Sequence, residues 1–205
     1  MKTTLLRFSV LGFLCTGSLL AMAQQGDVAI ALGTLSAPSA SFSTPSAFTQ
    51  GLGGGTYFGF NGDVLIKHYI GFEADVNWKT SQGLYAGQVP FRPLFFDFNA
   101  IYARRFTNFI GAEALAGIGA LSSRFYSSAF TNCDIYGNCS NYQSSNHFLA
   151  DFGGGIRLYA YHNFFIRPEV RLYLIHNNVE FSSGHAVRYG ASIGYTFGGT
   201  PLLKH

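Results

Sequence analysis

The stretch FFIRPEVRLYLI, residues 164–175, alternates charged and apolar side chains. Arg167, Glu169 and Arg171 occupy every second position, and apolar residues fill the positions between them. A β-strand has this period of two, because successive side chains point to opposite faces of a sheet. As a strand, the stretch would have one charged face and one apolar face. The fold class depends on which of these two faces lies inside.

The composition of the chain is unusual for a soluble domain. Its 205 residues are enough for one domain. Only 11% of them are charged, which is less than half of the roughly 25% typical of soluble proteins. Beyond the N-terminal segment, no apolar run reaches the roughly 20 residues that a membrane helix needs. If the chain crosses a membrane, it must therefore cross with strands.

The first 23 residues have the features of a secretory signal peptide. Two basic residues precede an apolar stretch, and Ala21-Met22-Ala23 forms a small-x-small cleavage site. Cys15 raises the alternative of a lipoprotein, but the bulky Leu14 stands where a lipidation site has a small residue. Cleavage removes two of the 13 basic residues and none of the 10 acidic ones. The mature chain, residues 24–205, is then close to neutral, and we expect no nucleic-acid partner.

Two cysteines remain in the mature chain, Cys133 and Cys139, within the polar segment TNCDIYGNCSN. In an oxidising compartment such a pair most simply closes a small disulfide loop. A metal site is the alternative, but two thiols without clustered histidines are weak support for zinc. We predict a disulfide, no metal and no other cofactor.

Alternation with a period of two recurs in eight segments of about the length that a tilted strand needs to cross a bilayer. The segments are residues 27–35, 52–60, 69–78, 94–103, 109–121, 147–159, 164–175 and 186–197. The joins are residues 36–51, 61–68, 79–93, 104–108, 122–146, 160–163 and 176–185. They alternate between long and short, as in outer-membrane barrels, although the second is longer than a tight turn. Pro168 predicts a local bulge, because proline cannot donate to the strand ladder.

Placing the apolar parity of all eight segments on one face puts every strand-borne charge on the other. These charges are Asp27, Glu73, Asp75, Asp97, Glu113, Asp151, Arg157, Arg167, Glu169, Arg171 and Arg188. In a soluble sandwich or lipocalin-like barrel, the outer surface would then be rich in small residues and poor in lysine and glutamate. We predict the inverse, an all-β fold that is an eight-stranded antiparallel transmembrane β-barrel with up-and-down topology. Its apolar side chains face lipid, its charges pair in the lumen, and inward glycines leave them room.

With its cleavable signal and a last strand that reads RYGASIGYTF, the chain resembles the OmpA-like small outer-membrane β-barrel family. Gly190, Ile193, Tyr195 and Phe197 match the C-terminal pattern that the barrel-assembly machinery reads in that family. The resemblance covers residues 26–197. It implies a monomer in the bacterial outer membrane, in contact with its lipid and delivered by periplasmic chaperones. The chain departs from the family in the tail GGTPLLKH, and no peptidoglycan-binding domain follows, so cell-wall anchoring is not implied.

Two kinds of small barrel are enzymes, and the sequence fits neither. The lipid A deacylase type presents a histidine, a serine two residues later and a glutamate on lipid-facing positions. Here Asn178 stands two residues after His176, before Glu180, and an amide cannot act as the nucleophile. Ser182 and Ser183 lie further into an external loop. The palmitoyltransferase type needs an apolar acyl-chain pocket, which a charged lumen does not provide, so we predict no catalytic site.

Two roles other than catalysis are compatible with the sequence. A narrow pore is one, but the lumen charges would plug so small an interior, and a structural salt-bridged core explains them better. Surface interaction is the other, because the join of residues 122–146 is long and rich in Ser, Asn and Tyr. Tyr126, Tyr136 and Tyr142 are candidate contacts there, although such a loop can simply cover the barrel mouth. We expect a structural or surface-interaction role, with a pore or a lipid-modifying enzyme as alternatives and no external ligand identified.

Overall fold

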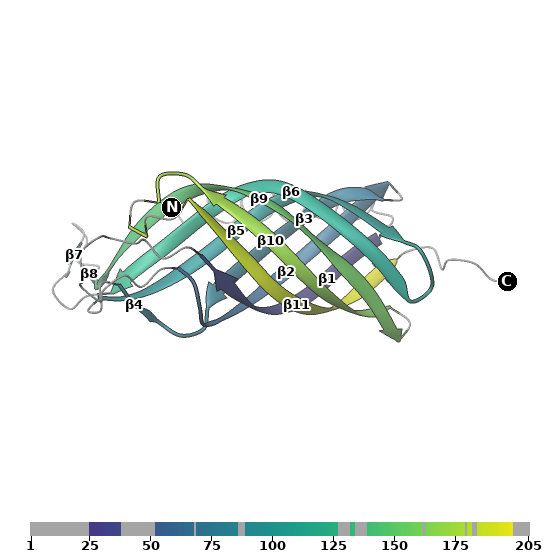
Figure 1. The fold of residues 1–205 in the computed structure, drawn as a ribbon, viewed down its shortest axis with the longest axis horizontal. Coiled ribbons are helices and arrows are strands. Elements are labelled where there is room, and N and C mark those ends of the chain that lie inside the picture. Colours follow the sequence, from purple (N-terminus) through teal and green to yellow (C-terminus); the bar gives the residue numbers. More distant parts are fainter. Residues whose placement is uncertain are drawn as a thin grey trace, which may run out of the picture.

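The computed structural model describes most of the chain between residues 25 and 198. The described residues are 25–37, 52–67, 69–85, 89–126, 132–133, 139–161, 163–178, 180–181 and 184–198. Eight long strands make one wall (Figure 1): β1 Gln25–Ser36, β2 Thr56–Lys67, β3 Ile70–Lys79, β5 Val89–Arg105, β6 Ile110–Tyr126, β9 Tyr142–Tyr161, β10 Phe164–Ile175 and β11 His185–Gly198. The predicted signal peptide, residues 1–23, and residues 199–205 of the tail lie outside the described residues.

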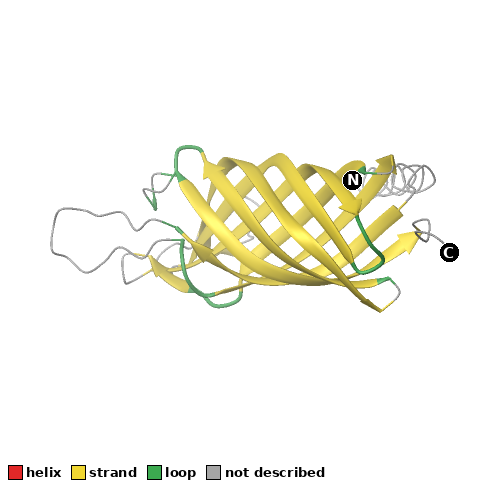
Figure 2. Cartoon of the chain, turned by 45° about the vertical axis from the view of Figure 1, so that its right-hand side comes forward, coloured by secondary structure: helices red, strands yellow, loops and turns green. Residues whose placement is uncertain are grey.

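Each long strand pairs antiparallel with its neighbour in the chain, and the first strand pairs with the last. Val28 of β1 lies opposite Tyr195 of β11, so the sheet has no free end at this seam. The strands run obliquely around the long axis (Figure 2). Closure gives every strand two partners, which is what a strand in lipid requires. The predicted closed eight-stranded antiparallel barrel is confirmed.

The described residues contain three further, short strands. β4 Gly83–Tyr85 pairs with the start of β5, and β7 Asn132–Cys133 pairs with β8 Cys139–Ser140 in a separate small sheet. Within the described ranges there is no helix long and apolar enough to span a bilayer.

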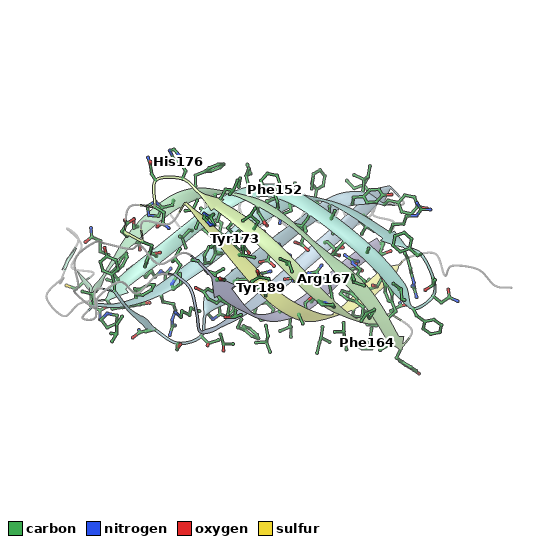
Figure 3. The ribbon with its side chains drawn as sticks, viewed as in Figure 1. Phe152, Phe164, Arg167, Tyr173, His176 and Tyr189 are labelled. Atoms are coloured by element: carbon green, nitrogen blue, oxygen red, sulfur yellow. The ribbon has the colours of Figure 1, made fainter. Side chains whose placement is uncertain are left out.

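The apolar parity points outward and the charged parity inward. Phe152, Phe164 and Tyr189 are about half exposed on the outer face, at 49%, 50% and 51%. Arg167 and Tyr173 have no exposed surface and point into the barrel (Figure 3). Side chains of a strand alternate between its two faces, and in each strand one set is apolar and the other is charged or small. The barrel therefore has an apolar outer face and a charged interior. Of the two faces of the stretch 164–175, the charged one therefore lies inside the barrel.

The two ends of the barrel differ in their connections. At one end, here called the turn end, the strands are joined by residues 68–69, 106–109 and 162–163. At the other, the loop end, the connections are longer and strands β5, β6 and β9 are extended, with 17, 17 and 20 residues against 10 in β3. Short turns at one end and long connections at the other are the arrangement expected from the alternating joins.

The predicted strand boundaries were wrong in three joins. β5 begins at Val89, inside the predicted join of residues 79–93, and the second predicted segment, residues 52–60, becomes strand only at Thr56. β2 continues to Lys67, so most of the predicted join of residues 61–68 is strand, with Asp63 opposite Glu73. Asn61 and Asp63 are buried and point inward, so they continue the alternation of β2 past residue 60. β6 and β9 likewise continue into the predicted join of residues 122–146, where Tyr126 lies opposite Tyr142.

The predicted bulge at Pro168 was also wrong. Pairing between β10 and β9 lapses at Arg167 and Pro168, but Ile166 and Glu169 on either side keep the same register. The register shift of this strand pair lies between Phe164 and Phe165 instead. The missing N–H of proline therefore interrupts the ladder without an inserted residue.

A charge placed on the outer face should destabilise the barrel most at its middle. Phe152→Arg puts a guanidinium halfway along the apolar face and should lower the free energy of unfolding by about 2 to 4 kcal/mol, against about 0 to 1 kcal/mol near an interface. Phe109→Arg, in the turn-end connection, is the matched control. Urea titration of protein refolded in lipid vesicles, followed by heat-modifiable gel migration, measures both, and equal losses would contradict the assignment of faces.

Candidate functional site

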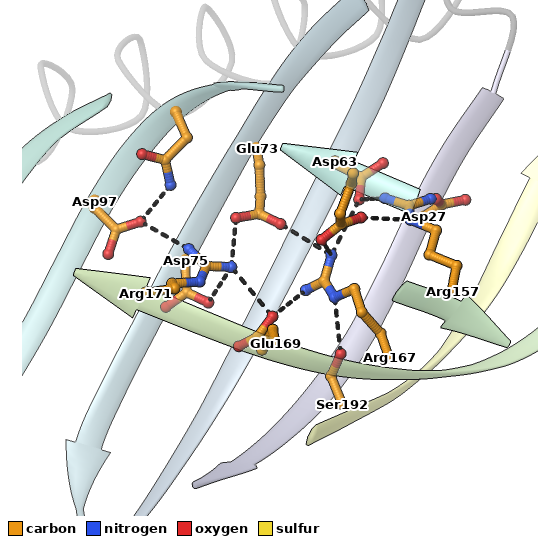
Figure 4. Close-up of polar contacts among 12 residues, drawn as sticks. Asp27, Asp63, Glu73, Asp75, Asp97, Arg157, Arg167, Glu169, Arg171 and Ser192 are labelled. Carbon is orange, nitrogen blue, oxygen red and sulfur yellow. Dashed lines mark hydrogen bonds and ion pairs between the residues drawn. The ribbon is translucent and has the colours of Figure 1, made fainter. Parts of the chain in front are cut away.

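The lumen gathers the eleven charged residues that the sequence places on the inward parity. All are buried, at 6% exposure or less, and they come from seven of the eight long strands: Asp27 (β1), Glu73 and Asp75 (β3), Asp97 (β5), Glu113 (β6), Asp151 and Arg157 (β9), Arg167, Glu169 and Arg171 (β10), and Arg188 (β11). Figure 4 shows most of them in one connected set of ion pairs. This set, with Asp63 of β2, is called the ionic layer below.

Arg157 occupies the turn-end part of the ionic layer. Its guanidinium contacts three carboxylates from three other strands: Glu113, Asp27 and Asp63, the last at 2.8 Å. The Arg157 guanidinium also lies 5.3 Å from the ring centre of Phe165. Each of its nitrogens therefore has a carboxylate partner, as a buried guanidinium requires.

Arg167 connects this part to the centre of the layer. Its Nη1 lies 2.9 Å from Glu113 and 3.1 Å from Glu73, and its Nη2 lies 3.1 Å from Glu169. Its Nε donates to the hydroxyl of Ser192 at 3.0 Å. Glu113 is thus shared between Arg167 and Arg157, which links strands β6, β9 and β10.

Arg171 is the centre of the loop-end part. Its Nη2 lies 2.7 Å from Glu73 and 3.4 Å from Asp75, and its Nη1 lies 3.4 Å from Asp97 and 3.5 Å from Asp151. Arg188 continues the network, with Nη1 at 3.2 Å from Asp75 and Nη2 at 2.5 Å from Glu169. Ion pairs therefore run without a break from Arg157 to Arg188.

Among the described residues, carboxylates outnumber guanidiniums in the ionic layer. Eight buried carboxylates face four buried guanidiniums, and Lys79, also buried, lies over the ring of Phe91 at 5.8 Å instead. Asp63 and Lys79 were missed in the sequence because the predicted segments ended at residues 60 and 78. The inward parity of Asn61 and Asp63 was the signal that could have extended the first of them.

Glycines beside the arginines provide the space for them. A Cβ atom at Gly153 would lie 2.9 Å from Cγ of Arg171, and one at Gly155 would lie 3.1 Å from Cγ of Arg167. Gly153 is the register partner of Arg171. The same Cβ atoms would lie 2.8 Å from the backbone oxygen of Val170 and 2.9 Å from that of Pro168, so a larger residue would press on the strand backbone as well as on an arginine.

Apolar side chains fill the lumen on the loop-end side of the ionic layer. This cluster, the outer apolar layer, consists of Leu35, Leu52, Tyr57, Phe91, Phe95, Leu121, Leu149, Tyr173, Ile175, Phe181 and Ala186, all at 5% exposure or less. The rings of Phe95 and Tyr173 stack at 5.0 Å between centres, and Phe181 enters from the β10–β11 connection to lie 5.0 Å from Phe91.

Two smaller apolar clusters lie at the turn end. Tyr159 and Phe165 pack with Ala29, and Leu65 packs with Ile101 and Ala103. Tyr159 of β9, Phe165 of β10 and Leu65 of β2 each lie one inward position closer to the turn end than a charged residue of the ionic layer. The ionic layer therefore lies between apolar packing on both sides.

A second polar cluster lies at the loop-end mouth, above the outer apolar layer. Ser145 Oγ lies 3.0 Å from Nε2 of His147, Glu180 lies 2.9 Å from the same nitrogen, and Ser145 also donates to Glu180. Burial acts to raise the pKa of Glu180, but the hydrogen bond from Ser145 and the neighbouring His147 outweigh it, so this pKa lies below its usual value. The cluster ties the β10–β11 connection to β9 beside Phe181.

This arrangement differs from a Ser–His–acid triad. In a triad the acid contacts one ring nitrogen and the nucleophile the other, so that the acid orients the base. Here Ser145 and Glu180 contact the same nitrogen of His147. No local motif in the sequence predicts the cluster, because Glu180 lies 35 residues from Ser145.

The deacylase-like stretch has no nucleophile in the described residues. His176 is exposed in the turn after β10 (Figure 3), and Asn178 is buried at 6% exposure. Ser182 and Ser183 lie outside the described residues. Nor do the described residues contain a group of three or more His, Cys, Asp or Glu side chains placed to hold a metal ion.

The backbone pairs β7 with β8 so that Cys133 and Cys139 are directly opposite each other. Opposed Cα atoms in an antiparallel pair are about 4.5 to 5.5 Å apart, which is within disulfide range. The disulfide itself stays a prediction.

The residues that match the assembly signal all lie on β11. Ile193 and Phe197 are 64% and 55% exposed on the outer face, with Tyr195 between them, and Gly190 has the inward parity. Their recognition by the assembly machinery stays a prediction.

Because carboxylates are in excess, removing a guanidinium should harm the barrel more than removing a carboxylate. Arg171→Met leaves five nearby carboxylates without their shared partner and should cost about 3 to 5 kcal/mol of unfolding free energy. Asp97→Asn keeps a polar side chain against Arg171 and Asn99 and should cost clearly less. Denaturant titrations of both variants in the same detergent compare them, and equal losses would show that Arg171 does not organise the layer.

Acid should loosen the β10–β11 connection. With a lowered folded-state pKa, Glu180 contributes stability above the usual pKa of glutamate, about 4.3, and that contribution disappears as the pH falls through the folded value. The amide NMR signals of Phe181 and Gly184 should broaden over that range, and in Glu180→Gln they should be broad already at neutral pH. Sharp signals in Glu180→Gln at neutral pH would contradict this anchoring role.

No protein-family model matches the sequence, and no curated protein matches it closely enough to count as a relative. Solved structures do match. Ail, the attachment invasion locus protein of Yersinia pestis, crystallised with the heparin analogue sucrose octasulfate, gives a TM-score of 0.56 at 13% identity, covering 86% of this chain and all of Ail. Neisserial surface protein A gives 0.55 at 12% identity, covering 84% of this chain and 96% of that protein. The chain therefore has the fold of the small eight-stranded outer-membrane β-barrels.

Proposed function

We propose that this protein is a closed, non-conducting barrel of the bacterial outer membrane, with a structural or surface-interaction role. The observation that carries the proposal is the filled lumen. The ionic layer joins strands across the whole interior, and the outer apolar layer covers it with side chains at 5% exposure or less. A water-filled path would need a polar, open lumen, as in larger barrels.

The outer face supports the membrane location. Large apolar side chains are exposed along β1, β3, β5, β9, β10 and β11, for example Val76 at 39% and Ile193 at 64%. In water, a continuous surface of this kind would be an aggregation hazard, whereas lipid is the solvent that it matches. The loop end then faces outward and the turn end faces the periplasm, as the signal peptide and the long connections predict.

The loop end supports the interaction role. The extended parts of β5, β6 and β9 continue as a sheet beyond the shorter strands, with Arg124 opposite Ser144 and Tyr126 opposite Tyr142. The rings of Tyr126 and Tyr142 are 6.2 Å apart. Tyr136, the third tyrosine considered in the sequence, lies outside the described residues. A rigid sheet that carries aromatic and polar side chains is a suitable base for binding loops.

We also propose that the protein is not an enzyme. The cluster of Ser145, His147 and Glu180 at the mouth lacks the geometry of a triad, and its hydroxyl and imidazole have the inward parity of β9. Its position between β9 and the β10–β11 connection fits a structural anchor. A monomer, a Cys133–Cys139 disulfide, and assembly by periplasmic chaperones and the barrel-assembly machinery complete the proposal.

Planar-bilayer recordings separate this function from a pore. The refolded protein should insert without producing single-channel steps, because two different layers close its lumen. The double variant Phe95→Ala/Tyr173→Ala, which thins the outer apolar layer, should stay silent as well, because the ionic layer remains. A larger porin in the same bilayers is the positive control, and regular conductance steps from the folded wild-type protein would overturn the proposal.

A further inference from the structure

Two arginines lie side by side on the outer face at the loop end. Arg92 of β5 and Arg124 of β6 are direct register partners, and both have the outward parity. The Cβ atoms of directly opposed residues are about 4.5 to 5.5 Å apart, and like charges so placed repel each other. A pair of this kind destabilises the sheet unless something negative lies against it.

The described part of the chain provides no negative partner for this pair. Neither arginine forms an ion pair with a described carboxylate. Eight carboxylates are buried in the lumen, and Glu180 contacts Ser145 and His147. The Nε of Arg92 is itself shielded from solvent and has no hydrogen-bond partner among the described residues. The two positive charges therefore lack a described carboxylate, and the Nε–H of Arg92 lacks a described acceptor.

The position of Arg124 is set by its neighbours. Its guanidinium lies 5.3 Å from the ring centre of Tyr142, and Ser144, exposed on β9, is its register partner on the other side. The pair therefore presents two guanidiniums and one hydroxyl in a row across β5, β6 and β9. Guanidinium forks match the oxygens of a phosphate group in shape and charge.

The height of the pair corresponds to the edge of the apolar face. Four residues toward the turn end on the same strands, the outward row is Phe96, Ala120 and Phe148. Four strand residues span about 13 Å, and somewhat less along the membrane normal for a tilted strand. Where Phe96 and Phe148 contact acyl chains, the arginines are at the depth of lipid headgroups.

We propose that Arg92 and Arg124, together with Ser144, bind a phosphate group on a lipid of the outer leaflet. The lipid is a phosphorylated glycolipid of the lipid A type, whose acyl chains lie against Phe96 and Phe148. The site goes beyond the proposed function, since a closed barrel needs no such ligand. It would hold the loop end at a fixed height in the membrane.

The turn end offers a matched contrast. Arg104 has the outward parity too, but its register partner is Ala112, and its guanidinium lies over the rings of Tyr69 and Phe106 at 5.4 and 5.7 Å. It therefore has no like-charged register partner. Substituting Arg104 removes one outer-face arginine without touching the proposed site.

Native mass spectrometry of the refolded full-length mature protein tests the proposal, with diphosphoryl lipid A added to the micelles. The wild-type protein and Arg104→Ala should retain the lipid, whereas Arg92→Ala/Arg124→Ala should bind it about 10 to 100-fold more weakly, as expected for lost charge-assisted hydrogen bonds. Lipid A without its phosphates should bind the wild-type protein as weakly as diphosphoryl lipid A binds the double variant.

The possible results distinguish a lipid-borne phosphate from apolar contact and from free phosphate. Equal binding by the wild-type protein and the double variant, both shown to be folded by heat-modifiable migration, would overturn the proposal. Equal binding of the phosphorylated and dephosphorylated lipid would also overturn it, because apolar contact alone would then be sufficient. Inorganic phosphate that displaced nothing at millimolar concentration would agree with a lipid-borne group, whereas full displacement would make free phosphate the ligand and overturn the lipid assignment. None of these results depends on whether the barrel conducts.

Discussion

The structure depends on four guanidiniums that hold eight strands together from the inside. Arg157, Arg167, Arg171 and Arg188 contact carboxylates on β1, β2, β3, β5, β6 and β10, so side chains far apart in the sequence meet at one axis. Each arginine is at most 2% exposed. A charge buried to that degree needs opposite charge against it, and each of these guanidiniums contacts at least two carboxylates, although Nε of Arg171 has no hydrogen-bond partner among the described residues. The arginines therefore constrain the register of the strands that carry their partners.

This constraint explains the other features of the wall. Glycine occurs beside Arg167 and Arg171 because a Cβ there would press on both the neighbouring backbone and the arginine side chain. The charged parity of each strand lines the lumen, so the opposite, mostly apolar parity forms the outer face. The outer apolar layer keeps water from the ion pairs, which strengthens them in a medium of low dielectric. Phe181 completes that layer, and Glu180 fixes its connection to β9. The mouth and the core are parts of one closed interior.

The sequence was enough to predict the fold and every member of the ionic layer except Asp63, because a period of two assigns every strand residue to one of two faces. It was not enough to set the strand ends, since Asn61 and Asp63 look like loop residues until their inward parity is followed. It could not show which carboxylate meets which arginine, because those contacts depend on strand tilt and side-chain reach across the barrel. The cluster of Ser145, His147 and Glu180 joins distant segments and has no local signal at all. Pro168 misled the prediction, because a proline can leave the ladder unpaired without adding a residue.

Acidic and basic side chains are distributed unequally between the inside and the outside of the barrel. Of the 10 acidic residues, eight line the lumen, Glu180 closes the mouth, and Asp134 lies outside the described residues. The described arginines that do not belong to the ionic layer are Arg92 and Arg124 at the loop end and Arg104 and Arg105 at the turn end. Arg104 and Arg105 lie over aromatic rings, and Arg105 donates to backbone oxygens of the turn, so their environment is supplied by the protein. Arg124 also lies near an aromatic ring, that of Tyr142, but it differs from them in having a second arginine, Arg92, as its direct register partner. Because nearly all of the carboxylates lie inside the barrel, the positive charges of Arg92 and Arg124 must be neutralised by groups outside the protein. At the edge of a membrane, those groups are the phosphates of lipid headgroups.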